Sequence, residues 1–239
     1  MTTLDSLLER VRDRHHHFTV YRGDEETDLP DRFATHAVNV DVERLPSGGP
    51  GPFVVIEADG EFVGAIGERE LDWLLEPPIA RPGESPGVSE GYRVLFDVLD
   101  ETVFRALSRR QLLAVSREIE DRAYRVGIGT LAVGFQTLSN FESQADLYRE
   151  LATATALDVH VFGAPDWAPP DIPGITYHRN SGQAQERHWV LGFEGGLDQL
   201  QACGLVAQEQ TDYYEGFWTD DEGLVDEILT ALGVHGTPT

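Results

Sequence analysis

The 239-residue chain contains 42 acidic and 18 basic residues, which gives a formal net charge of −24. All 18 basic residues are arginine, because the sequence contains no lysine. No basic stripe is available to neutralise phosphates, and no apolar run approaches the roughly 20 residues that a membrane helix needs. We therefore expect neither nucleic-acid binding nor membrane insertion.

The acid excess predicts a salt-rich environment. In dilute buffer such a surface repels itself and destabilises the compact state. At molar salt the Debye length falls to about 3 Å, so the repulsion is largely screened. The composition therefore predicts a protein of a halophilic archaeon. Because the N-terminus has no apolar segment of the signal-peptide kind, we expect a cytoplasmic location.

Residues 1–78 are predicted to form an N-terminal α+β region. The segment TLDSLLERV reads as a short helix with its leucines on one face, and FTVYR (18–22) reads as a strand. A helical turn is expected over 28–35, followed by a half-buried strand over 38–45. In FVVIEADGEFVGAIG, two apolar runs flank Asp59-Gly60, which predicts a β-hairpin with a type I′ turn.

A helix is expected over ERELDWLLE, and residues 79–91, rich in proline and glycine, are predicted to be a linker. Residues 92–235 are then expected to form the main domain. A helical pattern runs from about Tyr92 to Val126, with a break near Leu107–Ser108. Its second half carries a core-facing stripe, which consists of Leu112, Val115, Ile119, Ala123 and Val126.

After Gly127 and Gly129, which suit a helix C-cap, TLAVGF is predicted to be a buried strand. Ser139 and Glu142 have the spacing of a capping box, which predicts a helix that runs to about Ala156. VHVFG (159–163) completes a parallel strand–helix–strand unit.

Three further strands, ITYHR, HWVLGF and CGLVAQEQ, are expected to pair antiparallel because they follow one another closely. GFW is a short last strand and DEGLVDEILTAL a closing amphipathic helix. The predicted class is α+β: a mixed, mainly antiparallel sheet with packed helices, preceded by a smaller α/β region.

Charges crowd the helix around residues 116–125. Glu118–Arg122 and Asp121–Arg125 are acid-first pairs four residues apart, which is the favourable orientation on a helix face. They account for the charges without any chemistry. The alternative is an interaction surface for a partner helix or chain, composed of Arg117, Glu118, Asp121, Arg122 and Arg125.

One face of the predicted sheet combines small and polar residues, which is the kind of face that a ligand pocket uses. The candidate ligand-binding residues are Gln136, His160, Phe162 and Trp189. The alternative is that a helix or the first part of the chain covers this face.

No catalytic or phosphate-binding motif is present, so we expect no catalysis. Cys203 lies in an apolar stretch and is expected in the core. No metal site is predicted, because the adjacent His15–His17 point in different directions and cannot share an ion. Two alternatives stay open: an enzyme that uses His160 or His188 as acid and base, and a structural homodimer.

The segments LSRRQLLAVSREIEDRA, GFQTLSNF, YRELA, VHVFGAPDWAPPDIPGITYH and HWVLGF resemble, in that order, the DICT domain. The preceding SEGYRVLFDVLDETVF looks like the haloarchaeal members. The resemblance implies a sensory module with an α+β fold around a small sheet, and it leaves the cofactor unknown. Because no kinase, diguanylate cyclase or receiver segment is present, it implies a stand-alone regulator that acts on a separate signalling protein, such as a histidine kinase.

Overall fold

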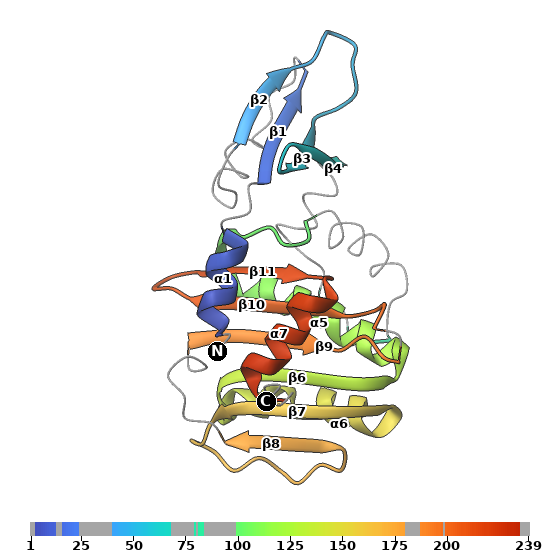
Figure 1. The fold of residues 1–239 in the computed structure, drawn as a ribbon, viewed down its shortest axis with the longest axis vertical. Helices are drawn as coiled ribbons and strands as arrows, with labels where there is room; N and C mark the ends of the chain where they lie inside the picture. Colours follow the sequence, from blue (N-terminus) through green and yellow to red (C-terminus); the bar gives the residue numbers. More distant parts are fainter. Residues whose placement is uncertain are drawn as a thin grey trace.

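The computed structural model describes residues 3–12, 16–23, 40–67, 79, 81–83, 99–179, 187–197 and 199–234. It contains a small sheet and a large sheet, which lie one above the other in Figure 1. The predicted helical turn over 28–35, the helix over 68–76 and residues 92–98 lie outside the described residues. None of the described helices is long and apolar enough to cross a bilayer.

The small sheet has the strand order β2-β1-β3-β4. Its strands are β1 (His16–Arg22), β2 (Val40–Arg44), β3 (Phe53–Ala58) and β4 (Glu61–Gly67). Asp59 and Gly60 join β3 to β4 with φ angles of 52° and 84°. Both are positive, as a type I′ turn requires, so the predicted hairpin is confirmed.

Strand β2 lies at the edge of this sheet and pairs parallel with β1. The strand was predicted correctly, but its burial was not: Asp41 to Arg44 are all exposed. An edge strand pairs with only one other strand. The alternation of apolar and polar residues along it does not reveal whether another element packs on its apolar side.

The large sheet has the strand order β5-β11-β10-β9-β6-β7-β8. Its first four pairings are antiparallel and the last two, β6·β7 and β7·β8, are parallel. Its strands are β5 (Phe104–Leu107), β6 (Ile128–Thr137), β7 (Ala156–Ala164), β8 (Ile175–Arg179), β9 (His188–Phe193), β10 (Cys203–Glu209) and β11 (Tyr214–Thr219). The predicted α+β class with a mainly antiparallel sheet is confirmed.

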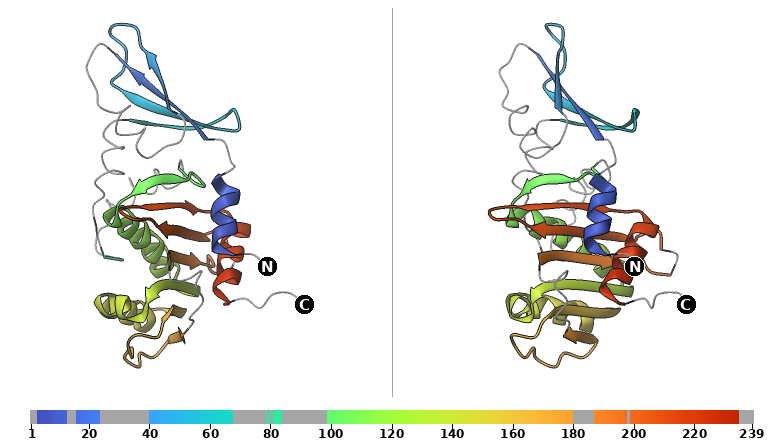
Figure 2. Two further views of the ribbon diagram at one scale, coloured as in Figure 1. Left: turned by 90° about the vertical axis from the view of Figure 1, so that its left-hand side faces the viewer. Right: turned by 60° about the vertical axis from the view of Figure 1, so that its left-hand side comes forward.

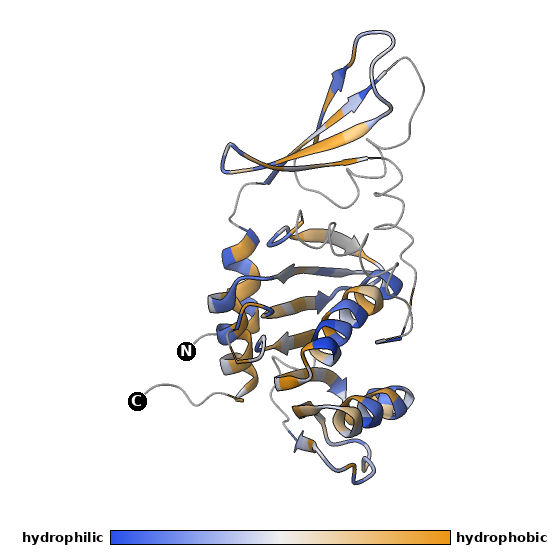
Figure 3. Ribbon diagram, turned by 90° about the vertical axis from the view of Figure 1, so that its right-hand side faces the viewer, coloured by the Kyte–Doolittle hydropathy of each residue, from blue (hydrophilic) through white to orange (hydrophobic). Residues whose placement is uncertain are grey.

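Helices cover both faces of the large sheet (Figure 2). One face carries α5 (Arg109–Val126), the 3₁₀ helix η1 (Leu138–Gln144) and α6 (Ala145–Ala154). The other carries α1 (Leu4–Arg12) and α7 (Glu222–Leu232), which contact each other. Along α5 and α6 hydrophilic and hydrophobic residues alternate around the helix, as Figure 3 shows, so each helix has an apolar side for the sheet.

Helix α5 forms as the sequence predicts. Ser108 accepts a hydrogen bond from the backbone N–H of Gln111, and the Gln111 side chain accepts one from Ser108 N–H, which makes a capping box. Gly127 ends the helix with a φ of 73°. The predicted stripe is buried at Leu112, Val115, Ile119 and Ala123, with Val126 packed against the same core.

Three predictions around this helix were wrong. Residues 104–107 form strand β5 rather than helix, because they pair with β11. Ser139 caps no helix; its backbone N–H and hydroxyl bond to Asp166, and Thr137 precedes η1 without a side-chain cap. Strand β8 pairs parallel with β7, whereas antiparallel pairing with the strands that follow it was predicted.

Helix α1 belongs with the large sheet, although it is followed in the chain by the small one. Its buried residues Leu4, Leu7, Leu8 and Val11 share a cluster with α7 and β10. Arg10 also forms an ion pair with Glu227 of α7 at 2.8 Å. The division of the chain at residues 79–91 stays a prediction. Helix α1 precedes this division in the sequence, but it packs against elements that follow it.

Candidate functional site

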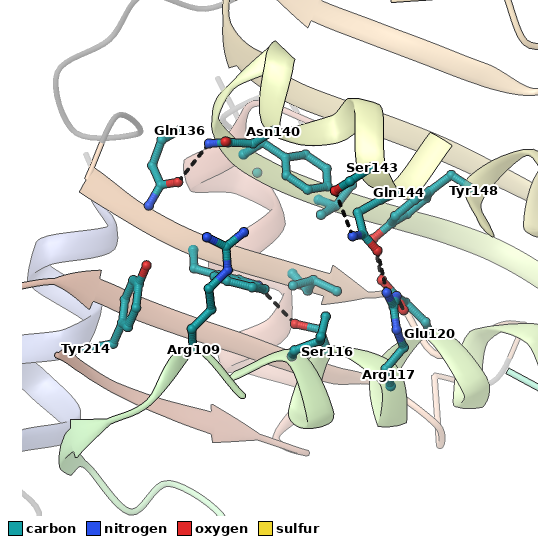
Figure 4. A pocket seen from close by; sticks show the side chains of 16 residues that line it. Arg109, Ser116, Arg117, Glu120, Gln136, Asn140, Ser143, Gln144, Tyr148 and Tyr214 are labelled. Atoms are coloured by element: carbon teal, nitrogen blue, oxygen red, sulfur yellow. Dashed lines mark hydrogen bonds and ion pairs between the residues drawn. The ribbon is translucent and has the colours of Figure 1, made fainter. Parts of the chain in front are cut away.

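A cavity of about 90 Å³ lies between α5 and the large sheet, at the end of β6. A single water needs only about 10–15 Å³ of such space, so the cavity holds several waters or a small organic molecule. Figure 4 shows its side chains. Its lining consists of Arg109, Leu113, Ser116, Arg117 and Glu120 of α5, Val133 to Gln136 of β6, Asn140, Ser143 and Gln144 of η1, Tyr148 of α6, Trp189 and Leu191 of β9, and Tyr214 of β11.

A buried polar group forms one end of the cavity. Glu120 accepts a hydrogen bond of 2.6 Å from the Tyr148 hydroxyl and pairs with Arg117. Arg117 also donates to Gln144 of η1, so it bridges α5 and η1. Burial raises the pKa of the Glu120 carboxyl, although Arg117 and the Tyr148 hydroxyl oppose that rise.

Aromatic rings form the wall on the sheet side. The indole N–H of Trp189 donates a hydrogen bond of 2.9 Å to the Ser116 hydroxyl. The guanidinium of Arg109 lies 5.9 Å from the Trp189 ring centroid, within the range of a cation–π contact. Tyr214 meets Trp189 edge to face, with 6.1 Å between ring centroids. The wall therefore offers flat apolar surfaces with polar edges.

Amide side chains line another part of the cavity. Asn140 donates to the side-chain oxygen of Gln136 at 3.2 Å, and Gln136 donates to Glu209 at 3.2 Å. Gln144, on η1, donates to Ser143 at 3.0 Å. These groups supply both donors and acceptors to a ligand.

Charge in the lining is opposite to charge in the whole protein. Two arginines, Arg109 and Arg117, line the cavity against one carboxyl group, that of Glu120. The whole chain has more than twice as many acidic as basic residues. The cavity is therefore a locally positive place in a strongly negative molecule.

Residues 93–210 match the DICT family, which is described as a sensory domain in diguanylate cyclases and two-component systems. This part of the chain belongs to the DICT family. The DICT segment supplies every residue of the cavity lining except Tyr214. The resemblance expected from the sequence motifs is thus confirmed, and with it a sensory role in signalling.

Comparison with curated proteins finds no relative. Among solved structures, the crystal structure of polyphosphate kinase from Porphyromonas gingivalis matches 97% of this chain and 47% of its own, at 14% identity and a TM-score of 0.39. The chain thus spans about half the length of that kinase, and a similarity this weak has no bearing on the DICT domain.

The cavity of the DICT domain contains two of the four predicted ligand-binding residues, Gln136 and Trp189. Phe135 and Gln136 are neighbours and both line it, which regular alternation along a strand would not allow. The register of β6 on β7 shifts between Gly134 and Thr137. Such an irregularity changes the direction in which a side chain points. Gln136, which lines the cavity, lies within the shifted segment.

His160 and Phe162 lie elsewhere. Phe162 is buried in the cluster that contains α1 and α7, on the other face of the sheet. It stacks on His178 at 4.2 Å between ring centroids, and Nδ1 of His160 lies 2.8 Å from Nε2 of His178. Burial and then the neighbouring His160 lower the pKa of His178, while Asp158 opposes them.

The predicted interaction surface is mostly inside the protein. Glu118 and Arg122 are buried, and Arg122 pairs with Asp220 at 2.9 Å. Arg117 lines the cavity. The predicted Asp121–Arg125 pair is present at 3.0 Å, and Arg125 also lies 3.6 Å from Glu118. Of the five side chains, that of Arg125 is the most exposed.

Sequence reasoning missed most of the cavity residues. Arg109, Ser116 and Glu120 recur along α5 with nearly the same spacing as the core stripe and beside it. A polar residue that keeps the core period is a signal for a buried polar site, and Glu120 is 2% exposed. No local signal marks Tyr148 or Tyr214, because they reach the cavity through tertiary packing alone.

Proposed function

We propose that the protein is a non-catalytic signal-transduction module whose DICT domain senses a small molecule bound in the cavity between α5 and the large sheet. The observation that carries the proposal is the cavity itself, which combines aromatic walls with amide, hydroxyl and guanidinium groups inside the family match. A concave, largely preformed site with a few polar groups is the usual form of a small-molecule site.

The walls of the cavity suggest how binding is transmitted. They come from α5, from the end of β6 and from η1, and Arg117 joins α5 to η1 across the cavity. A ligand shifts a conformational equilibrium only by its differential affinity for two states. A ligand that replaces the contact between Arg117 and Gln144 would have such a preference, because it would free α5 from η1.

The outer side of α5 is the proposed output. The backbone N–H of Gly83 donates a hydrogen bond of 2.9 Å to Asp121, and an added Cβ on Gly83 would lie 3.2 Å from the Tyr124 ring. The chain that precedes the DICT domain therefore touches this helix directly. With Arg117, Glu118 and Arg122 turned inward, the proposed partner surface is reduced to Asp121 and Arg125.

The acidic, lysine-free composition supports a cytoplasmic role in a halophilic archaeon. The partner in this proposal is a histidine kinase or another regulator, because the family is described from two-component systems. The enzyme alternative has no support from the cavity, since neither His160 nor His188 lines it. His188 is buried, with Nε2 3.2 Å from Asp5. A homodimer stays a prediction, which light scattering at high salt would test.

Thermal shift in molar KCl tests the proposal with fractionated small-molecule extract from a halophile. Ser143→Trp places a large side chain in the cavity from an exposed position on η1, and Thr153→Trp makes the same change on the exposed side of α6. We expect a fraction that raises the melting temperature of the wild type and of Thr153→Trp but not of Ser143→Trp. A shift that Ser143→Trp retains, or no shift with any fraction, would contradict the proposal.

A further inference from the structure

The position and the contacts of Arg109 indicate a class of ligand. This residue is exposed at the start of α5, lines the cavity and lies over the Trp189 ring. No carboxylate in the described part of the chain forms an ion pair with it. In a protein with 42 acidic residues, an arginine that lies beside a cavity and has no carboxylate partner among the described residues is available for an anion from outside.

The second arginine does not cancel this preference. Arg117 is held by Glu120 and Gln144, so the pair of Arg117 and Glu120 is neutral as a unit when both are ionised. The net charge of the lining is then that of Arg109 alone. Glu209, which accepts a hydrogen bond from Gln136, does not line the cavity.

The shape of the walls selects a flat molecule. Trp189, Tyr214 and Phe135 present rings to a cavity of about 90 Å³. Aromatic rings prefer offset or edge-to-face contact with other rings, and Trp189 and Tyr214 already adopt that arrangement with each other. A single ring with one small substituent matches the space.

We propose that the cavity binds a small planar carboxylic acid, with its carboxylate on the Arg109 guanidinium and its ring against Trp189. This inference rests on the proposed function, because it names the ligand class of the same cavity. Gln136 and Asn140 supply further hydrogen bonds at the polar edge of the ring. The guanidinium fork matches a carboxylate with two parallel hydrogen bonds, which a chloride ion cannot reproduce. That geometry keeps the preference at molar salt, where bare charge attraction is screened.

Calorimetric titration of the full chain in molar KCl tests this with two matched pairs of probes: benzoate with benzamide, and nicotinate with nicotinamide. Each pair has one ring and differs in the charge of its substituent. Arg109→Gln removes the charge at the cavity and keeps hydrogen-bonding atoms. Arg110→Gln makes the same change at the next residue, which is exposed and does not line the cavity.

We expect the acids to bind about tenfold or more tightly than their amides, a difference of about 1.4 kcal/mol. Arg109→Gln should remove that preference and Arg110→Gln should keep it. Equal binding of acids and amides, a preference that survives Arg109→Gln, or no binding of either acid would overturn the inference. A melting shift with extract that Ser143→Trp abolishes would still support the cavity as a sensory site, so the two proposals fail separately.

Discussion

The hydroxyl of Tyr148 donates a hydrogen bond of 2.6 Å to the Glu120 carboxyl, and both side chains are almost fully buried. Loss of water raises the pKa of Glu120, and the same burial raises the pKa of Tyr148 well above 10.0. The Glu120 carboxyl is thus a weaker acid than an exposed glutamate. Tyr148 of α6 and Arg117 of α5 both contact it. This pair connects the cavity to the stability of the domain.

Glu120→Gln should change how stability depends on pH. The folded state holds the Glu120 proton more tightly than the unfolded chain does. In the unfolded chain the pKa of Glu120 is near 4.5. The stabilisation from protonated Glu120 is therefore full below pH 4.5 and is lost as pH rises through the raised pKa of the folded protein. The free energy of unfolding of Glu120→Gln minus that of the wild type should therefore increase with pH across that window. Below pH 4.5 this difference should not change with pH.

Urea unfolding at a series of pH values in constant KCl measures this difference. Glu142→Gln is the control, because Glu142 is exposed on η1 and outside the cavity. A difference between Glu120→Gln and wild type that stays constant with pH would contradict the raised pKa.

Arg122→Ala should destabilise the fold far more than Arg125→Ala. The Arg122 side chain is 7% exposed and pairs with Asp220, whereas Arg125 is 38% exposed. The Asp220 carboxylate that Arg122→Ala leaves behind is itself 29% exposed, so we expect a loss of roughly 2–4 kcal/mol, somewhat less than for a fully buried pair. An exposed pair contributes about 0.3–0.5 kcal/mol, and less at high salt. Equal losses in urea unfolding would show that Arg122 acts as a surface residue.

Cys203 should resist thiol reagents in the folded state. The residue is fully buried, and burial raises the pKa of its thiol to about 12, with Arg122 opposing that rise. Only the thiolate is nucleophilic, and the reagent has no access. A colorimetric disulfide reagent should label no thiol in the native protein and one in denaturant. Fast native labelling would mean that β10 opens readily.

The melting temperature should rise steeply with salt. At a net charge of −24, self-repulsion acts over a Debye length of about 10 Å at 0.1 M salt, which shortens to about 3 Å at 1 M. KCl and NaCl should act alike if screening is the cause. A melting temperature that is the same in dilute and molar salt would remove the main support for a halophilic origin.

The features that sequence predicted are those set by local spacing. The apolar stripes of α1 and α5, the Asp59-Gly60 turn and the Gly127 cap each depend on residues within a few positions of one another. The recognisable run from GFQ onward identified the family for the same reason, since its motifs are contiguous.

The features that sequence did not predict depend on distant partners. Strand β5 is extended because β11 pairs with it, which no helical spacing reveals. Glu118 and Arg122 were predicted to pair on a helix face, yet both are buried, and Arg122 pairs with Asp220, which precedes α7. Of the four predicted ligand-binding residues, only Gln136 and Trp189 reach the side that α5 covers.

The mixed pairing of the large sheet also sets an order of assembly. Strands β6, β7 and β8 follow one another between residues 128 and 179. Strand β5, in contrast, pairs with β11, which lies about a hundred residues further along the chain. Closing a longer loop costs more entropy, so the β5·β11 pairing should form after β6·β7, and during synthesis β6, β7 and β8 are complete before β11 exists. Pulse-labelled hydrogen exchange should then protect β6 and β7 amides before those of β5. Since Trp189 and Tyr214 come from the later half, a nascent chain that ends before β11 lacks part of the cavity wall, and the proposed response to a ligand would require β11 to be in place.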